Sequence, residues 1–373
     1  MEPGDELDWA AVEAAGLLAD APDTEDRKEL LRLLAKDGVS VPEMVDAHRN
    51  GALMRVVGER TIRPGVGTLT LREVADRAGT DVEVAQRILR SLGAITPEPD
   101  ERTSAEDDIE LVECALLLLE VFGEQTGWAL LRRYGNLLER LTEATSAAVI
   151  REHPDISTLH SGSEATTART WSAIAATVPR GGRLLDLASR HQIEAVRRYF
   201  EQAGAGEATA GTFVLGIGFA DLSGYTAASH LLELQDIGGL VADFEARATD
   251  IVADHGGRIV KFVGDAVLFV SNDPDELVAI ASVLVEPSGG DGPLQARAGL
   301  ARGPVLARDG DYFGPTVNLA ARLVDVAGPG SVLVDEGLRA SLDPDRWEIV
   351  TDEPVRLRGF DQPVTAHRVT GQR

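Results

Sequence analysis

The hydrophobic pattern of the chain changes between residues 203 and 211, and this change constrains the fold more than any other feature. Before it, apolar residues recur with helical spacing in segments such as Val74–Leu92 and Leu130–Leu141. Residues 203–211 are small, Gly-rich and without periodicity, as is typical of a linker. We therefore predict an all-helical domain over residues 1–202 and a domain of a different class over residues 212–373.

The second half of the chain alternates between predicted strands and helices. Apolar runs predict strands at residues 212–219, 258–262, 266–271, 294–301, 304–308 and 331–334, with closing strands within 355–369. Helical periodicity predicts helices at residues 237–255, 275–286 and 316–326. The leading β-α-β-β-α-β order is the split βαβ pattern of ferredoxin-like folds. The predicted fold class is therefore α+β, with an all-α domain preceding a ferredoxin-like domain.

Two aspartates occupy matching places in this pattern. Asp221 follows the first predicted strand of the second domain, and Asp265 directly precedes the third. These strands are expected to be antiparallel neighbours, so the two carboxylates should meet at one edge of the sheet. Buried carboxylates are costly when unpaired, and two close ones repel each other unless they share cations. The pair therefore predicts a divalent-metal site, where Mg²⁺ would take a few protein oxygens plus substrate phosphates.

The second half of the chain holds four further candidate polar residues. Lys261 lies on the second predicted strand, and Asp311 lies in the predicted loop before helix 316–326. Asn318 and Arg322 are four positions apart on that helix and so share one face. A guanidinium beside an amide suits a phosphate charge and a sugar oxygen, while a carboxylate can accept a hydrogen bond from an amino group.

Three segments in this order carry a family resemblance, namely residues 219–226, 258–269 and 311–323. They resemble the motifs of class III nucleotidyl cyclases, the adenylate and guanylate cyclase homology domain, over roughly residues 212–370. The resemblance implies that Asp221 and Asp265 bind two Mg²⁺ or Mn²⁺ ions. It also implies that catalysis takes place in a homodimer with two equivalent sites.

The same resemblance implies a role for each remaining candidate. Lys261 and Asp311 match the pair that reads the purine, and Asn318 and Arg322 match the pair that stabilises the transition state. Arg358, in Leu357-Arg358-Gly359-Phe360, resembles a basic residue that contacts the terminal phosphates. In each site the two aspartates would come from one chain and the purine and transition-state pairs from the other.

The purine pair favours ATP over GTP. A lysine donor and an aspartate acceptor complement N1 and the N6 amino group of adenine, whereas guanine would require the reverse pattern. The implied reaction is attack of the ribose 3′-hydroxyl of ATP on the α-phosphorus, giving 3′,5′-cyclic AMP and pyrophosphate. One metal ion would lower the pKa of the attacking hydroxyl. A dinucleotide cyclase is disfavoured, because the hairpin lacks a Gly-Gly-Asp/Glu-Glu-Phe signature.

Residues 69–93 have the spacing of a helix-turn-helix, with a small residue at Ala75 and a turn at Gly79. The alternative function is therefore a nucleotide-binding transcription regulator. The formal net charge of −25 opposes it, and the candidate recognition segment 81–90 offers only Arg87 and Arg90 as bases. We expect no nucleic-acid partner, and we interpret the segment as a helical packing unit.

The N-terminal half resembles, more loosely, the helical regulatory domain of adenylate cyclases of actinobacterial type. This implies control of the catalytic dimer, which we expect residues 183–201 to transmit, with a proton or a lipid-like ligand as the signal. The chain starts with an acidic segment rather than a basic signal peptide, and it has one cysteine, Cys114, which we predict to be buried. These features predict a cytoplasmic protein without stable membrane insertion.

Overall fold

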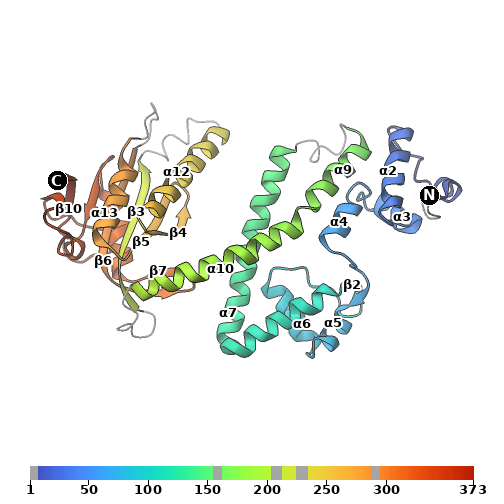
Figure 1. Ribbon diagram of the computed structural model, residues 1–373, viewed down its shortest axis with the longest axis horizontal. Coiled ribbons are helices and arrows are strands. Elements are labelled where there is room, and N and C mark those ends of the chain that lie inside the picture. The colour runs from blue at the N-terminus through green and yellow to red at the C-terminus, as the bar shows by residue number, and fades with distance from the viewer. Residues whose placement is uncertain (1–6, 154–161, 203–211, 224–233, 288–294) are drawn as a thin grey trace. The chain divides into compact units, whose positions relative to one another are not determined.

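The computed structural model describes residues 7–153, 162–202, 212–223, 234–287 and 295–373 (Figure 1). The chain divides into two compact units, residues 1–189 and 190–373. The predicted linker, residues 203–211, lies outside the described residues. Helix α10 (Val178–Gln202) begins in the first unit, and its part from Arg190 onward belongs to the second.

The first unit is built from helices, with one short two-stranded sheet. The helices are α1 (Trp9–Ala14), α2 (Thr24–Lys36), α3 (Val41–Arg49), α4 (Val56–Ile62), α5 (Leu71–Arg77), α6 (Val82–Ser91), α7 (Asp107–Glu152) and α9 (Glu164–Ala175). Strands β1 (Leu69–Thr70) and β2 (Arg102–Ser104) pair antiparallel. Capping boxes fix the starts of α3 and α5, where Ser40 pairs with Glu43 and Thr70 with Glu73.

Helix α7 is broken at Gly123, whose backbone is not helical (φ 74°, ψ 163°). By length and composition alone, α7 is the one helix in the described part of the chain that could cross a membrane. The break leaves its apolar first part at residues 107–122, shorter than the about 20 residues that span a bilayer. Cys114 lies on an exposed face of this part, so the prediction that it is buried was wrong.

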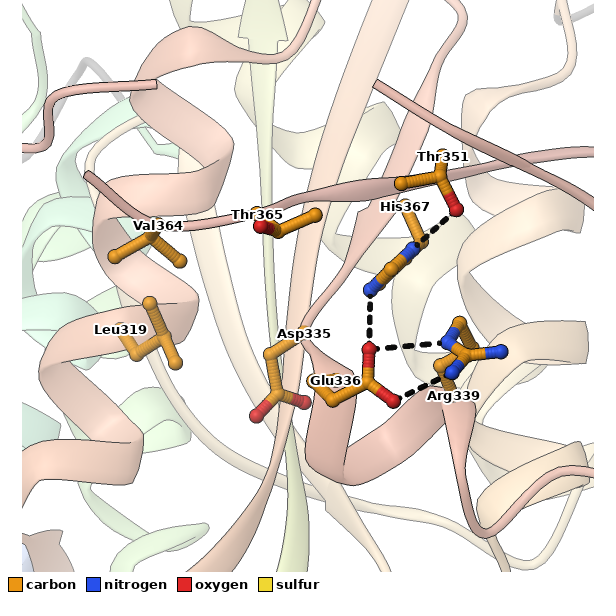
Figure 2. Close-up of a pocket in the computed structure, with 8 residues that line it drawn as sticks. All are labelled: Leu319, Asp335, Glu336, Arg339, Thr351, Val364, Thr365 and His367. Carbon is orange, nitrogen blue, oxygen red and sulfur yellow. Dashed lines mark hydrogen bonds and ion pairs between the residues drawn. The ribbon is translucent and has the colours of Figure 1, made fainter. Parts of the chain in front are cut away.

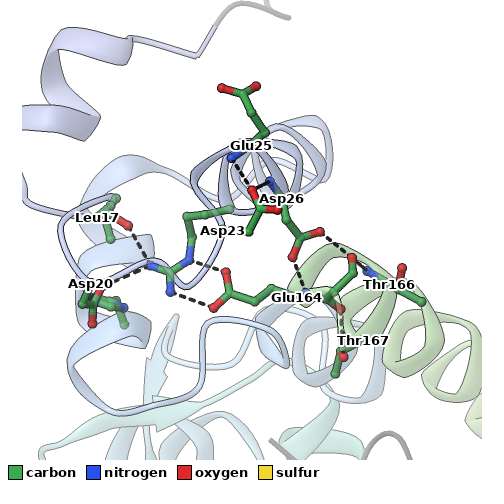
Figure 3. A network of polar contacts seen from close by, with 11 residues as sticks. Leu17, Asp20, Asp23, Glu25, Asp26, Glu164, Thr166 and Thr167 are labelled. Atoms are coloured by element: carbon green, nitrogen blue, oxygen red, sulfur yellow. Dashed lines mark hydrogen bonds and ion pairs between the residues drawn. The ribbon is translucent and has the colours of Figure 1, made fainter. Parts of the chain in front are cut away.

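Helix α9 is joined to α2 by a network of charged groups (Figure 3). The Arg27 side chain is 5% exposed, and its Nε and Nη2 donate to the two carboxylate oxygens of Glu164 at 2.5 and 2.7 Å. Its Nη1 donates to the carbonyl of Leu17 at 2.7 Å. On the other side, Asp26 accepts hydrogen bonds from the Ser163 hydroxyl and the Glu164 backbone N–H. The N-terminus of α9 is therefore fixed to α2 by paired, largely buried charges.

We expect Glu164→Ala to destabilise the first unit by about 3 kcal/mol, because it leaves the buried Arg27 guanidinium without its bidentate carboxylate and with only the exposed Asp20, at 3.5 Å. Glu29→Ala is the matched control, since Arg169 and Glu29 join the same two helices by an ion pair that is about half exposed on both sides. That control should cost less than about 1 kcal/mol. Calorimetric unfolding of the full chain measures both, and equal losses would contradict this account of the network.

The second unit contains a mixed sheet of eight strands. Its strands are β3 (Thr212–Ser223), β4 (Arg258–Val263), β5 (Ala266–Ser271), β6 (Gln295–Arg308), β7 (Asp311–Phe313), β8 (Val332–Val334), β9 (Trp347–Thr351) and β10 (His367–Gln372). Its other helices are α12 (Leu234–Asp254), α13 (Pro274–Val285), α14 (Pro315–Val326) and α15 (Glu336–Arg339). The strand order β4-β5-β3-β6 places the first and third strands side by side and antiparallel. The predicted ferredoxin-like arrangement is confirmed.

Each face of this sheet carries its own apolar cluster. One cluster joins the sheet to α12 and α13 through residues such as Phe244, Phe269 and Leu277. On the opposite face, Leu215, Ile217 and Leu268 pack with Ala320 of α14. Helix α14 lies so close to β6 that a Cβ added at Gly299 would fall 2.2 Å from the backbone nitrogen of Val324. The fold therefore fixes α14 against the face of the sheet that also bears Asp221.

Some element boundaries differ from those predicted. Strand β3 continues to Ser223, because Leu222 and Ser223 still pair with β6, so Asp221 lies within the strand rather than after it. Asp311 starts the short strand β7 instead of lying in a loop. Strand β6 is continuous across the predicted break at residues 302–303. The closing strands are β9 and β10, and within 355–366 there is only an isolated bridge between Val355 and Val364.

Candidate active site

The sheet brings Asp221 and Asp265 together, as the strand order predicts. Asp221 pairs with Ala266 across β3 and β5, and the Leu222 backbone N–H donates to the Asp265 carbonyl at 3.2 Å. Burial raises the pKa of the Asp265 carboxyl above its usual value, and the charge of Asp221 raises it further. Two neighbouring carboxylates that repel each other form a set of oxygen ligands that suits divalent cations.

Arg297, which belongs to no recognisable sequence motif, already places a positive charge on this pair. It is the cross-strand neighbour of Asp221 on β6, and its Nε and Nη2 donate to the two Asp221 oxygens at 2.6 and 3.0 Å. Its Nη1 donates to the carbonyl of Asp325 at 3.1 Å, at the end of α14. A bidentate guanidinium satisfies one carboxylate and partly offsets the charge at the other. The residues present therefore fit positive charge at the predicted metal position.

Lys261 and Asp311 are also brought together, within a single chain. The ammonium of Lys261 donates to Oδ2 of Asp311, and Oδ1 of the same carboxylate accepts the Tyr312 backbone N–H at 2.9 Å. A bulge in β4 makes this possible, because the register shifts between Ile259 and Lys261. The shift turns Lys261 to the same face of the sheet as Arg258. The pair is partly exposed, so both groups are accessible to a ligand.

Asn318 and Arg322 lie about one turn apart on α14, on the side that faces away from the core. Asn318 is exposed, and Nη1 of Arg322 donates to Asp325 at 2.8 Å. Within the described residues, neither side chain bonds to Asp221, Asp265, Lys261 or Asp311. One chain thus brings Asp221 next to Asp265 and Lys261 next to Asp311, and it presents Asn318 and Arg322 separately on α14.

Arg358 lies in an exposed turn after the buried Leu357. In the part of the chain that the structure describes, it makes no hydrogen bond or ion pair with the other candidate residues. Its assignment as a phosphate contact therefore stays a prediction.

A separate pocket of about 540 Å³ lies between α14, α15 and the closing strands (Figure 2). His367, 2% exposed, contacts Oγ1 of Thr351 at 3.0 Å through Nδ1, and its Nε2 lies 2.9 Å from Glu336. Arg339 donates to the same Glu336 carboxylate at 2.5 and 3.1 Å. The partly buried Asp335 accepts hydrogen bonds from the backbone N–H groups of Arg302 and Leu338 at 3.1 and 2.9 Å. The carboxylates of Asp335 and Glu336 in this pocket therefore already have hydrogen-bond partners.

Both units of the chain match known protein families. Residues 12–192 match the family model of the adenylate cyclase regulatory domain, and residues 212–371 match that of the adenylate and guanylate cyclase catalytic domain. The chain is 41% identical to an uncharacterized protein of Mycobacterium tuberculosis over 97% of this chain and 94% of that protein.

An adenylate cyclase of Streptomyces coelicolor is 32% identical over 72% of this chain and 70% of its own length. Among solved structures, the adenylyl cyclase CyaB of P. aeruginosa is similar at 24% identity and a TM-score of 0.40, covering 43% of this chain and 96% of that one. The chain therefore belongs to the adenylate cyclase family of enzymes, in which it joins an adenylate cyclase regulatory domain to an adenylate and guanylate cyclase catalytic domain.

Proposed function

We propose that this chain converts ATP to 3′,5′-cyclic AMP and pyrophosphate. The observation that carries the proposal is the Lys261–Asp311 pair, held on the same sheet as the paired carboxylates of Asp221 and Asp265. A lysine donor beside an aspartate acceptor complements adenine and leaves guanine with mismatched groups. Formation of cyclic AMP by the purified full chain, supplied with ATP and Mg²⁺ or Mn²⁺, tests the proposal.

Each candidate side chain has a task in this reaction. Asp221 and Asp265 would hold the divalent cations, which supply positive charge to the reacting hydroxyl and phosphate oxygens when bound. Arg322 would offset charge at the α-phosphoryl group, and Asn318 would orient the ribose. Arg358 would contact the terminal phosphates. Catalysis would then consist mainly of positioning and electrostatic stabilisation.

We propose that the active form is a homodimer. Asn318 is exposed and Arg322 partly exposed on α14, and within the described residues neither bonds to Asp221 or Asp265 of its own chain. Two copies related by a two-fold axis would bring Asn318 and Arg322 of one chain to the aspartate pair of the other, which gives two equivalent sites. A monomer would then hold every group but no complete site.

The alternative function, a nucleotide-binding transcription regulator, is disfavoured by the contacts of α5 and α6. Arg77 donates to both oxygens of Glu106 at 2.7 and 2.6 Å, and Arg72 pairs with Asp100 at 2.8 Å. The guanidinium carbon of Arg87 lies 3.9 Å from the centre of the Trp128 ring. Of the two bases of the candidate recognition segment, Arg87 is therefore engaged by an aromatic ring, and the neighbouring Arg72 and Arg77 are engaged by carboxylates rather than left for phosphates. These contacts support a packing role for residues 69–93.

We propose that the first unit regulates the second, with residues 183–201 of α10 as the transmitting segment. Deletion of residues 1–205 should change the specific activity of the catalytic unit severalfold, because the helix that leads into the catalytic unit would be lost. Cyclase assays on the full and truncated chains, with the oligomeric state measured alongside, check this. Equal kinetics in a truncated dimer would contradict a regulatory role for the first unit.

A further inference from the structure

The last turn of α10 is attached to the catalytic unit beside the purine pair. The Tyr199 side chain is 8% exposed and belongs to the apolar cluster on the α14 face of the sheet. Its backbone carbonyl accepts a hydrogen bond from Nδ2 of Asn272 at 2.9 Å, and the carbonyl of Asn272 accepts one from Arg302 at 3.3 Å. Both the ring and the main chain therefore hold this helix end in place.

Arg258 connects Tyr199 to the strand that carries Asp311. Its guanidinium carbon lies 5.4 Å from the centre of the Tyr199 ring and 5.5 Å from that of Tyr312, so one cation contacts two rings. Its Nη2 also donates to the Tyr312 hydroxyl at 2.5 Å. Burial raises the pKa of the Tyr312 phenol, so the hydroxyl that accepts this bond is in its neutral form.

Both members of the purine pair adjoin this cluster. Tyr312 follows Asp311 directly, and its backbone N–H donates to the Asp311 carboxylate at 2.9 Å. Arg258 lies three positions before Lys261 on β4, and the bulge in that strand turns both side chains to one face. A shift of Tyr312 would therefore move a hydrogen-bond donor of the Asp311 carboxylate, and a shift of Arg258 would disturb the strand that carries Lys261.

We propose that Tyr199, Arg258 and Tyr312 are positioning residues for the purine pair, through which the end of α10 sets the affinity and base selectivity of the site. The inference rests on the proposed function, and it adds the step that the regulatory helix would act upon. Movement of Tyr199 away from the sheet would remove one of the two rings that hold Arg258. Arg258 would then hold the Tyr312 hydroxyl less firmly, and the Asp311 carboxylate beside Tyr312 could rotate. Nucleotide binding would weaken and ATP would lose its advantage over GTP, while the chemical step would change little.

The test compares Tyr312→Phe and Tyr199→Leu with the unaltered full chain. Affinities for ATP and GTP are measured by titration calorimetry, and KM and kcat by cyclic nucleotide formation. Loss of a hydrogen bond from a charged donor should weaken ATP binding and raise its KM about tenfold in Tyr312→Phe. The ATP-to-GTP ratio of affinities should fall in both variants, with kcat changed less than about twofold. Tyr199→Phe keeps the ring that faces Arg258 and should restore ATP binding.

Trp347→Leu is the matched control, because it removes a buried ring whose centre lies 5.3 Å from the guanidinium carbon of Arg346, away from the purine pair. It should lower stability and leave nucleotide affinity unchanged. Unaltered affinities for both nucleotides in Tyr312→Phe and Tyr199→Leu, or a loss confined to kcat, would overturn the inference. A full chain that binds ATP without cyclising it would contradict only the proposed function, because the affinity comparison does not depend on turnover.

Discussion

Asp265→Ala is expected to abolish cyclisation, lowering kcat about a thousandfold or more. The substitution removes one of two carboxylates that would hold the cations at the reacting phosphate, and electrostatic stabilisation of this kind contributes about 4 kcal/mol or more. Stability should not fall, because burial and the charge of Asp221 both raise the pKa of this carboxyl and so disfavour its ionised form. Steady-state kinetics and thermal unfolding of the variant measure the two effects. An active Asp265→Ala enzyme would contradict the assignment of the metal pair.

Mixing variants tests whether each site is shared between two chains. Asp265→Ala and Asn318→Ala chains should each be inactive, yet each mixed dimer would contain one intact site. Equal mixing with free exchange gives about half mixed dimers, so about a quarter of the original activity should return. The control mixes Asp265→Ala with Asp221→Ala, where every site keeps a defective aspartate pair. Activity in the control mixture, or none in the first, would exclude the proposed division of the site.

Exchange of the purine pair is expected to have the second largest effect. The double variant Lys261→Glu/Asp311→Lys reverses donor and acceptor, so kcat/KM for ATP should fall about a hundredfold or more and fall less for GTP. The ratio of kcat/KM for ATP to that for GTP measures the change. Exchanging the exposed pair Arg368 and Asp352, whose groups lie 2.8 Å apart in the same unit, is the control and should leave the ratio unchanged. An unchanged ratio in Lys261→Glu/Asp311→Lys would show that other groups read the base.

The proximity of Asp221 and Asp265 could be predicted from the sequence, because it follows from strand order alone. A split βαβ pattern makes the first and third strands neighbours, whatever their side chains are. The residue at which β3 ends could not be predicted from the sequence. Asp221 and the residues after it are typical of a turn, yet β6 is long enough to pair with Leu222 and Ser223 and so extends the strand.

Arg297 and the bulge in β4 were missed because both depend on register. Arg297 is significant because it lies opposite Asp221, and an apolar strand pattern does not reveal which residues pair across strands. The one available signal was a charged residue flanked by Ala296 and Ala298 in the first half of β6, which is largely buried. Similarly, strict alternation would turn Lys261 and Arg258 to opposite faces, and only the unpaired position in β4 brings them to the same one.

Identification of the product tests most directly whether this chain cyclises ATP. The purified dimeric chain is incubated with ATP or GTP and with Mg²⁺ or Mn²⁺, and the nucleotides are separated and identified by mass. We expect 3′,5′-cyclic AMP and an equal amount of pyrophosphate from ATP, and much less cyclic product from GTP. Absence of a cyclic product from both nucleotides with both metals would contradict the account.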